Sequence, residues 1–142
     1  MSRRTPTTRR AVDTSVVVAA LVVGHSHEAV ALPVIRGGDV GLPAHVAVEA
    51  YSVLTRLPGT AFRPADAMRA VTMTFPEPWL TLNGADLRHT LTVLADTGLT
   101  GGRAYDGLIA MTVKVHGLIL VTLDRRAAPT YEALGVPFEL LT

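Results

Sequence analysis

Four acidic side chains stand at positions where a folded chain rarely leaves a charge without a use for it. Asp13 interrupts the apolar stretch RRAVDTSVVVAAL at 9–21, and Asp124 directly follows the apolar segment LILVTL. Glu49 and Asp106 fall on the apolar stripes of two segments with helical periodicity. Because an unpaired charge is costly in a protein interior, each position indicates either a specific partner or a chemical role.

If the four acids converge, they need neutralisation. Two unit charges roughly 4 Å apart repel by about 4 kcal/mol at an effective dielectric constant of about 20. Either a carboxylate takes up a proton or a divalent cation binds among them. The chain has no cysteine, and oxygen ligands alone favour Mg²⁺ or Mn²⁺ over zinc. Such an ion activates water and stabilises charge on phosphate oxygens, which is nuclease chemistry. The hydroxyls of Ser15 and Thr122 stand beside two of the acids and could orient them.

The composition predicts one folded domain. The 142 residues are 49% hydrophobic and 18% charged, with a net charge of +1. Residues 1–9 are polar and lack periodicity, so we expect a flexible tail at 1–9 and a single domain at 10–142. No apolar run reaches the roughly 18 residues of a membrane span, and the start lacks the pattern of a signal peptide. The absence of cysteine agrees with a cytoplasmic location.

Short apolar runs alternate with helical segments along the whole chain. Strands are predicted at 10–14, 39–43, 79–82, 118–122 and 137–141. Helices are predicted at 15–23, 27–38, 43–57, 62–75, 84–98, 103–117 and around 130–135. This alternation predicts an α/β fold with a twisted, mainly parallel sheet flanked by helices on both faces. Ligands bind such sheets at the carboxyl ends of the strands, where Asp13 and Asp124 both fall.

Each acid also has a purely structural interpretation. Asp13 and Asp124 could cap the helices that follow them, Glu49 could pair with Arg56, and Asp106 could pair with Arg103. Two further acids, Asp86 and Asp96, favour structural or solvated roles. Three arginines close to the acids are weak candidates for contacts with RNA phosphates: Arg103, Arg125 and Arg126. His25 and His27 do not form a convincing metal motif, and Trp79 and Tyr51 fit a core or an interface better than a base-stacking platform.

Five segments in order resemble one known family. They are VDTSVVVAAL at 12–21, AVEAYSVLTRL at 47–57, AYDGLIAMTVKVHG at 104–117, LVTLDRR at 120–126 and LGVPFELL at 134–141. Together they resemble the PIN-domain ribonucleases, specifically the VapC-type toxins of bacterial toxin–antitoxin pairs. The resemblance covers nearly the whole chain.

The resemblance implies an endoribonuclease that depends on Mg²⁺ or Mn²⁺, with Asp13, Glu49, Asp106 and Asp124 as its catalytic and metal-binding residues. It also implies an RNA substrate, a homodimer and inhibition by a cognate VapB-type antitoxin. The chain departs from the family pattern around its last acid. Leu123 stands where many members have Asn, and Arg126-Ala127 where they have an aromatic residue. Whether Asp124 binds the metal directly or through water therefore stays open.

Three other functions compete with this interpretation. A phosphatase of the haloacid-dehalogenase type needs a second Asp two residues after the first, where this chain has Ser15. A receiver domain needs a lysine after a late strand, but the only lysine, Lys114, falls inside a predicted helix. The stronger alternative is a non-catalytic PIN-like module that binds RNA or a protein without cleaving it.

Overall fold

Four short parallel strands form the central sheet, in the order β2-β1-β3-β4. In the computed structural model, which describes residues 9–142, the strands are β1 (Arg10–Val12), β2 (Val40–Gly41), β3 (Ile119–Thr122) and β4 (Phe138–Leu140). In the register, Val12 of β1 lies opposite Val121 of β3. Since all strands are parallel, their carboxyl ends meet at one edge. The residues that follow β1 and β3 are therefore neighbours in space.

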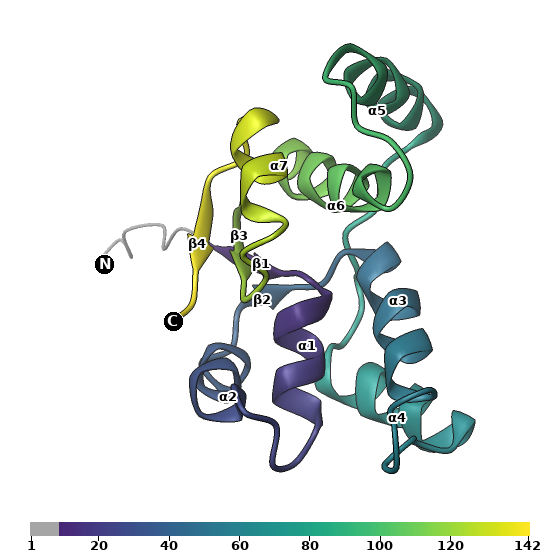
Figure 1. Cartoon of the computed structure of the whole chain (residues 1–142), viewed down its shortest axis with the longest axis vertical. Coiled ribbons are helices and arrows are strands. Elements are labelled where there is room, and N and C mark those ends of the chain that lie inside the picture. Colours follow the sequence, from purple (N-terminus) through teal and green to yellow (C-terminus); the bar gives the residue numbers. More distant parts are fainter. Residues whose placement is uncertain (1–8) are drawn as a thin grey trace, which may run out of the picture.

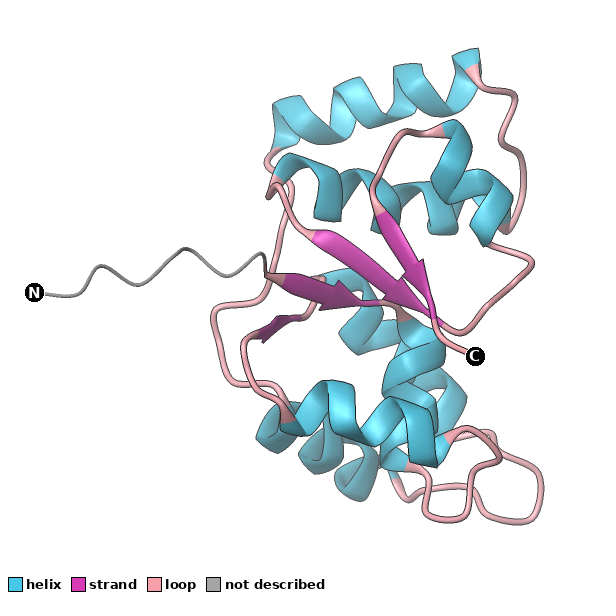
Figure 2. Ribbon diagram, turned by 90° about the vertical axis from the view of Figure 1, so that its left-hand side faces the viewer, coloured by secondary structure: helices cyan, strands magenta, loops and turns pink. Residues whose placement is uncertain are grey.

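Helices cover both faces of this sheet, as Figures 1 and 2 show. One layer holds α1 (Thr14–Leu21), α2 (Glu28–Arg36), α3 (Ala44–Leu54) and α4 (Pro64–Thr74). The other holds α5 (Gly84–Asp96), α6 (Arg103–Val115) and α7 (Ala128–Ala133). The predicted α/β class, with a parallel sheet between helices, is confirmed.

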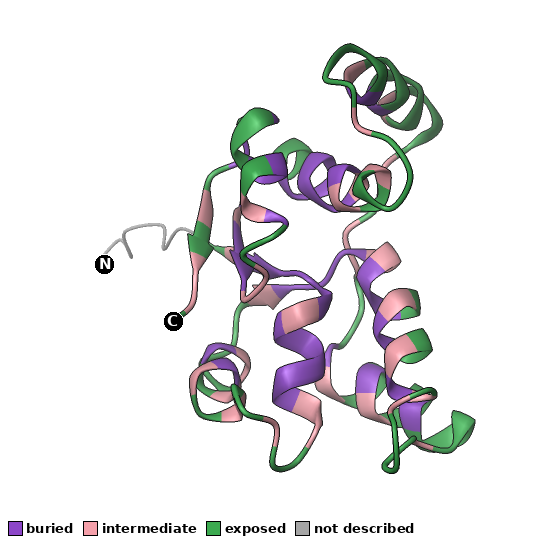
Figure 3. Cartoon of the chain, viewed as in Figure 1, coloured by how far each residue is buried: buried purple, intermediate pink, exposed green. Residues whose placement is uncertain are grey.

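The core lies where the sequence is most continuously apolar. Ala11 and Val12 of β1 and Leu120 and Val121 of β3 are completely buried, because helices pack on both sides of these two central strands. Buried residues also fill α1 and one side of α6 (Figure 3). Two caps begin helices as their sequences predict. Asp13 caps α1, and the Asn83 side chain accepts a hydrogen bond of 2.8 Å from the Asp86 backbone N–H.

The prediction of a strand at 79–82 was wrong. Only a single bridge forms there, between Pro43 and Leu80. Leu80 exchanges two backbone hydrogen bonds with the chain after β2, of 2.8 Å each. Pro78 lacks an N–H on one side and Asn83 already caps α5 on the other, so too few residues remain for a strand.

Most other predicted elements form but are shorter than expected. The first strand ends at Val12 rather than at residue 14, because Asp13 already caps the helix. Of the expected tail at 1–9, residues 1–8 lie outside the described part. Arg9 is described, and its Nε lies 2.8 Å from Oδ1 of Asp39 while its carbonyl accepts from the Ile119 N–H. Among the helices in residues 9–142, none has both the length and the apolarity that crossing a membrane requires.

Candidate active site

Asp13 lies at the carboxyl end of β1 and is almost fully buried, with 3% of its surface exposed. Its Oδ1 accepts hydrogen bonds from Ser15 Oγ at 2.5 Å and from the Val16 N–H at 3.4 Å. Its Oδ2 accepts from Thr122 Oγ1 at 2.5 Å and from the Tyr131 hydroxyl at 2.9 Å. Burial raises the pKa of Asp13, and these four donors partly offset that rise. Asp13 is thus both a helix cap and the centre of a hydrogen-bond network.

Ser15 and Thr122 connect the ends of the two central strands. Each hydroxyl donates to Asp13 and accepts from a backbone N–H after β3: Ser15 Oγ from Leu123 at 2.9 Å, and Thr122 Oγ1 from Asp124 at 3.0 Å. The structure therefore brings both predicted hydroxyls to Asp13. They also fix the backbone on which Asp124 stands.

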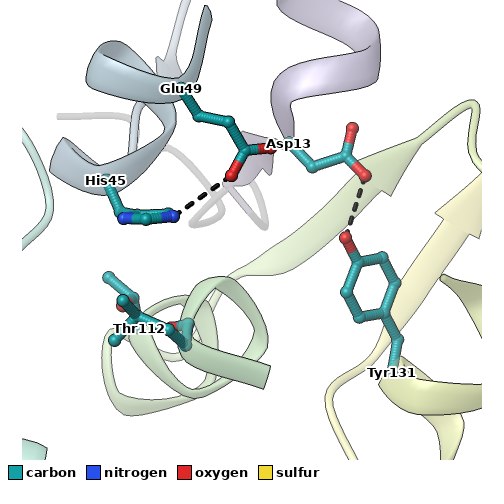
Figure 4. A network of polar contacts seen from close by, with 6 residues as sticks. Asp13, His45, Glu49, Thr112 and Tyr131 are labelled. Carbon is teal, nitrogen blue, oxygen red and sulfur yellow. Dashed lines mark hydrogen bonds and ion pairs between the residues drawn. The ribbon is translucent and has the colours of Figure 1, made fainter. Parts of the chain in front are cut away.

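Tyr131 is a member of this network that sequence reasoning missed. It reaches Asp13 from α7, as Figure 4 shows, and only 1% of it is exposed. Its ring packs edge-on against Phe138, with the ring centroids 6.1 Å apart. Burial, followed by the charge of Asp13, raises the pKa of Tyr131, so the phenol stays protonated and remains a donor. No local sequence signal links two residues 118 positions apart.

Glu49 projects from α3, and about a third of its side chain is exposed. Its Oε2 lies 3.1 Å from Nε2 of His45, one turn earlier in the same helix (Figure 4). The His45 ring in turn stacks on Tyr105 of α6, with centroids 5.4 Å apart and planes 3° from parallel. The partner of Glu49 is therefore His45, not Arg56 as the structural interpretation suggested. The sequence signal for this pair is the i, i+4 spacing of His45 and Glu49, which places them on the same side of a helix.

Asp106 lies in the first turn of α6, and the other three acids influence its pKa. Its pKa is raised to about 6, chiefly by burial and then by the negative charges of Asp124, Glu49 and Asp13. The charge of Arg103 lowers it. Within residues 9–142 no ion pair joins Asp106 to Arg103. The three other acids, from separate parts of the chain, therefore act electrostatically on Asp106.

Asp124 is partly exposed two residues after β3. Its Oδ1 accepts from the Arg126 N–H at 2.9 Å, so the residue stabilises the turn that leads to α7. This contact resembles the capping role considered from the sequence, although Asp124 is not the N-cap of α7. Arg103, Arg125 and Arg126, the candidate phosphate contacts, are exposed close in sequence to Asp106 and Asp124.

The donor set agrees with a hard divalent cation in its chemistry. All four side chains offer oxygen, and after burial the charges of Asp124, Glu49 and Asp13 raise the pKa of Asp106. The side chains are not arranged as a complete set of metal ligands. In the part of the chain that the structure describes, no three Asp, Glu or His residues are grouped so that they could hold a metal ion. Both oxygens of Asp13 already accept two hydrogen bonds, whereas Glu49, Asp106 and Asp124 are partly exposed.

Comparison with known proteins identifies the family of the chain. The PIN domain family model matches residues 10–132. Ribonuclease VapC27 of Mycobacterium tuberculosis is 41% identical over 127 residues, covering 89% of this chain and 92% of the relative. Ribonuclease VapC40 of the same species is 42% identical over 132 residues, covering 92% of this chain and 97% of the relative.

The fold comparison agrees as well. The structure of M. tuberculosis VapC20, described as a toxin that cleaves the sarcin–ricin loop, superposes with a TM-score of 0.66 and 17% identity. The match covers 85% of this chain and 94% of that one. At this identity the likeness supports the fold, and the closer sequence relatives supply the family. The chain therefore belongs to the PIN-domain family, among the VapC-type ribonucleases.

Proposed function

We propose that this protein is an endoribonuclease that depends on Mg²⁺ or Mn²⁺ and acts as the toxin of a toxin–antitoxin pair. The observation that carries the proposal is at Asp106, whose pKa is raised first by burial and then by the charges of Asp124, Glu49 and Asp13. Clustered acids destabilise the folded state through their mutual repulsion. A site that binds a cation and a phosphodiester is a function that requires such a cluster. The relatives named ribonucleases support RNA as the substrate.

Glu49, Asp106 and Asp124, which are partly exposed, would hold the metal, and the buried Asp13 would complete the group of acids. When bound, it supplies a water of lowered pKa and stabilises charge on the phosphate oxygens. The side chains of this protein do the positioning. Ser15, Thr122 and Tyr131 hold the carboxylate of Asp13 in one orientation. His45 holds that of Glu49.

The electrostatics of the surroundings add a requirement for positive charge. A polyanionic strand approaching several carboxylates is repelled, so cations nearby must offset that repulsion. Arg103, Arg125 and Arg126 are exposed next to the acids and are suited to contacting RNA phosphates. We also propose a cytoplasmic protein that forms a homodimer and is inhibited by a VapB-type antitoxin. The VapC-type relatives support the antitoxin.

The test is cleavage of total bacterial RNA by purified protein in EDTA, Mg²⁺ or Mn²⁺. We expect discrete fragments from the wild type with either metal, at least 100-fold fewer with Asp13→Ala or Asp106→Asn, and none in EDTA. Asp96→Asn is the matched control, because Asp96 is an exposed carboxylate at the end of α5. Binding of RNA without cleavage by the folded, antitoxin-free wild type would instead support the non-catalytic module.

A further inference from the structure

A shallow hollow of about 340 Å³ begins at Asp124 and extends to His25 and His27, which have no role in the function proposed above. Ser15 and Asp124 line it beside the acid cluster, and His25 and His27 line it from the loop between α1 and α2. That loop follows the end of α1 that lies away from the sheet (Figure 1). A helix of eight residues is about 12 Å long, so the hollow extends along α1. The histidines therefore stand about one helix length from the acids.

The two imidazoles have a defined arrangement. The His27 backbone N–H donates to Nδ1 of His25 at 3.0 Å, which leaves Nε2 of a neutral His25 as the nitrogen that carries the proton. The rings lie 5.9 Å apart and are tilted by 42°. Gly24, with a φ of 83°, turns the chain into this loop and its N–H lies 3.4 Å from Oε1 of Glu28. The loop between α1 and α2 therefore holds the imidazole rings of His25 and His27 in a defined arrangement.

The lining of the hollow distinguishes between possible ligands. Val18, Val53 and Leu123 form its apolar part, and no Arg or Lys among the described residues lines it. The carboxylate of Asp124 would repel a phosphate there. In addition, Thr14 lines the hollow with a buried hydroxyl that has no hydrogen-bond partner within residues 9–142. Apolar faces with polar groups at the edge match the shape of a nucleobase, not that of a phosphate.

We propose that this hollow binds an unpaired nucleobase of the RNA strand, with His25 and His27 contacting the base while a phosphodiester of the same strand lies at the acids. This inference rests on the proposed function and adds a determinant of RNA sequence to it. A base rather than a metal is proposed as the ligand of the histidines, because apolar side chains line the hollow beside them. A side chain that reads the base should affect selectivity as well as affinity.

The test measures binding without cleavage. Fluorescence anisotropy in EDTA follows the affinity of eight-nucleotide homopolymers of A, C, G and U for the wild type. We expect one homopolymer to bind best. In the double variant His25→Ala/His27→Ala its affinity should fall about tenfold and the four affinities should become similar. His27→Ala alone, at an exposed position that should not disturb folding, should lose affinity about threefold. His89→Ala, on the exposed face of α5, is the matched control and should bind as the wild type does.

Two results would overturn the inference: equal affinity and preference in the wild type and the double variant, or no binding of any homopolymer by the wild type in EDTA or in Ca²⁺, a cation that oxygen ligands bind and that would offset the charge of the acids. Cleavage of total RNA in Mg²⁺ is measured in parallel and tests the proposed function separately. Selective binding that depends on the histidines, together with no cleavage, would retain the base site and remove the nuclease. Cleavage with an unchanged double variant would retain the nuclease and remove the base site.

Discussion

Asp13 is an ionisable side chain that is almost completely buried, and burial raises its pKa. Its four hydrogen-bond donors come from three elements, namely the start of α1, the end of β3 and α7. Donors of this kind stabilise a carboxylate by holding its ionised form, and they also fix its direction. Because the donors come from distant parts of the chain, the orientation of Asp13 depends on the tertiary structure.

Replacing Tyr131 by Phe tests that dependence. The ring and its contact with Phe138 should remain, while Oδ2 of Asp13 loses one of two donors. We expect the free energy of unfolding to fall by about 1.5–3 kcal/mol, the usual contribution of a hydrogen bond to a charged group. Cleavage should fall about tenfold. Urea denaturation and single-turnover cleavage measure the two effects. Tyr51→Phe, at an exposed tyrosine of α3, is the control; equal cleavage by Tyr131→Phe and the wild type would contradict the role.

Asp106→Asn should stabilise the metal-free protein at neutral pH. The folded-state pKa of about 6 lies above the ordinary 3.8, so the folded state binds more protons between these values. Wild-type stability therefore falls as pH rises from about 4 to about 6 and is level above that range. Asn removes this loss, which is on the order of 1 kcal/mol after solvent screening. Melting temperatures in EDTA at pH 4 and pH 7.5 check it; a variant less stable than the wild type at pH 7.5 would refute the argument.

The acids could be found from the sequence, but their partners could not. A charged residue within an apolar periodic segment can be recognised from the neighbouring residues alone. Four candidate metal ligands follow from this pattern: Asp13, Glu49, Asp106 and Asp124. Tyr131 looks like an ordinary core aromatic, since its partner lies 118 residues away. His25 and His27 were set aside because their spacing is poor for a metal, and only the fold places them beside Ser15 and Asp124.

At the scale of elements, the alternation of apolar runs and helical periods was sufficient for the class and for most of the order. Boundaries and one strand were not predictable, because they depend on which backbone groups find partners. The segment at 79–82 has the composition of a strand, yet only Leu80 pairs with the chain after β2. The local sequence pattern does not show that the neighbouring strand, β2, is only two residues long.

The contact between α5 and α6 gives a prediction at this scale. A Cβ added to Gly107 of α6 would lie 2.3 Å from Cδ2 of Leu94 on α5, so the two helices approach closely there. Gly107→Ala should therefore lower unfolding free energy by on the order of 1 kcal/mol, although alanine has the higher helix propensity. Gly84→Ala at the start of α5, where the added Cβ meets nothing within 4 Å, should be neutral or stabilising. Urea denaturation compares them; a more stable Gly107→Ala would show that Leu94 moves aside without cost.

At the scale of the whole molecule, the acids belong to both helical layers and to the sheet between them. Glu49 comes from α3 in one layer and Asp106 from α6 in the other, while Asp13 and Asp124 follow the two central strands. Their mutual repulsion therefore acts between parts of the molecule that the core holds together. A cation bound among them would both enable the proposed chemistry and stabilise the fold.

This linkage can be measured without RNA. A ligand that binds only the folded state at 100 times its Kd adds about 2.7 kcal/mol of stability. Mg²⁺ or Mn²⁺ should therefore raise the melting temperature of the wild type by several degrees. The rise should largely disappear in Asp106→Asn, which lacks one charge of the cluster but is the more stable protein in EDTA. Asp96→Asn should keep the full rise, because Asp96 is exposed at the end of α5. The contrary result has two parts: neither metal changes the melting temperature of the wild type, and Asp106→Asn is more stable than the wild type in EDTA. The acids would then repel one another without binding a cation, and the metal-dependent mechanism would be refuted.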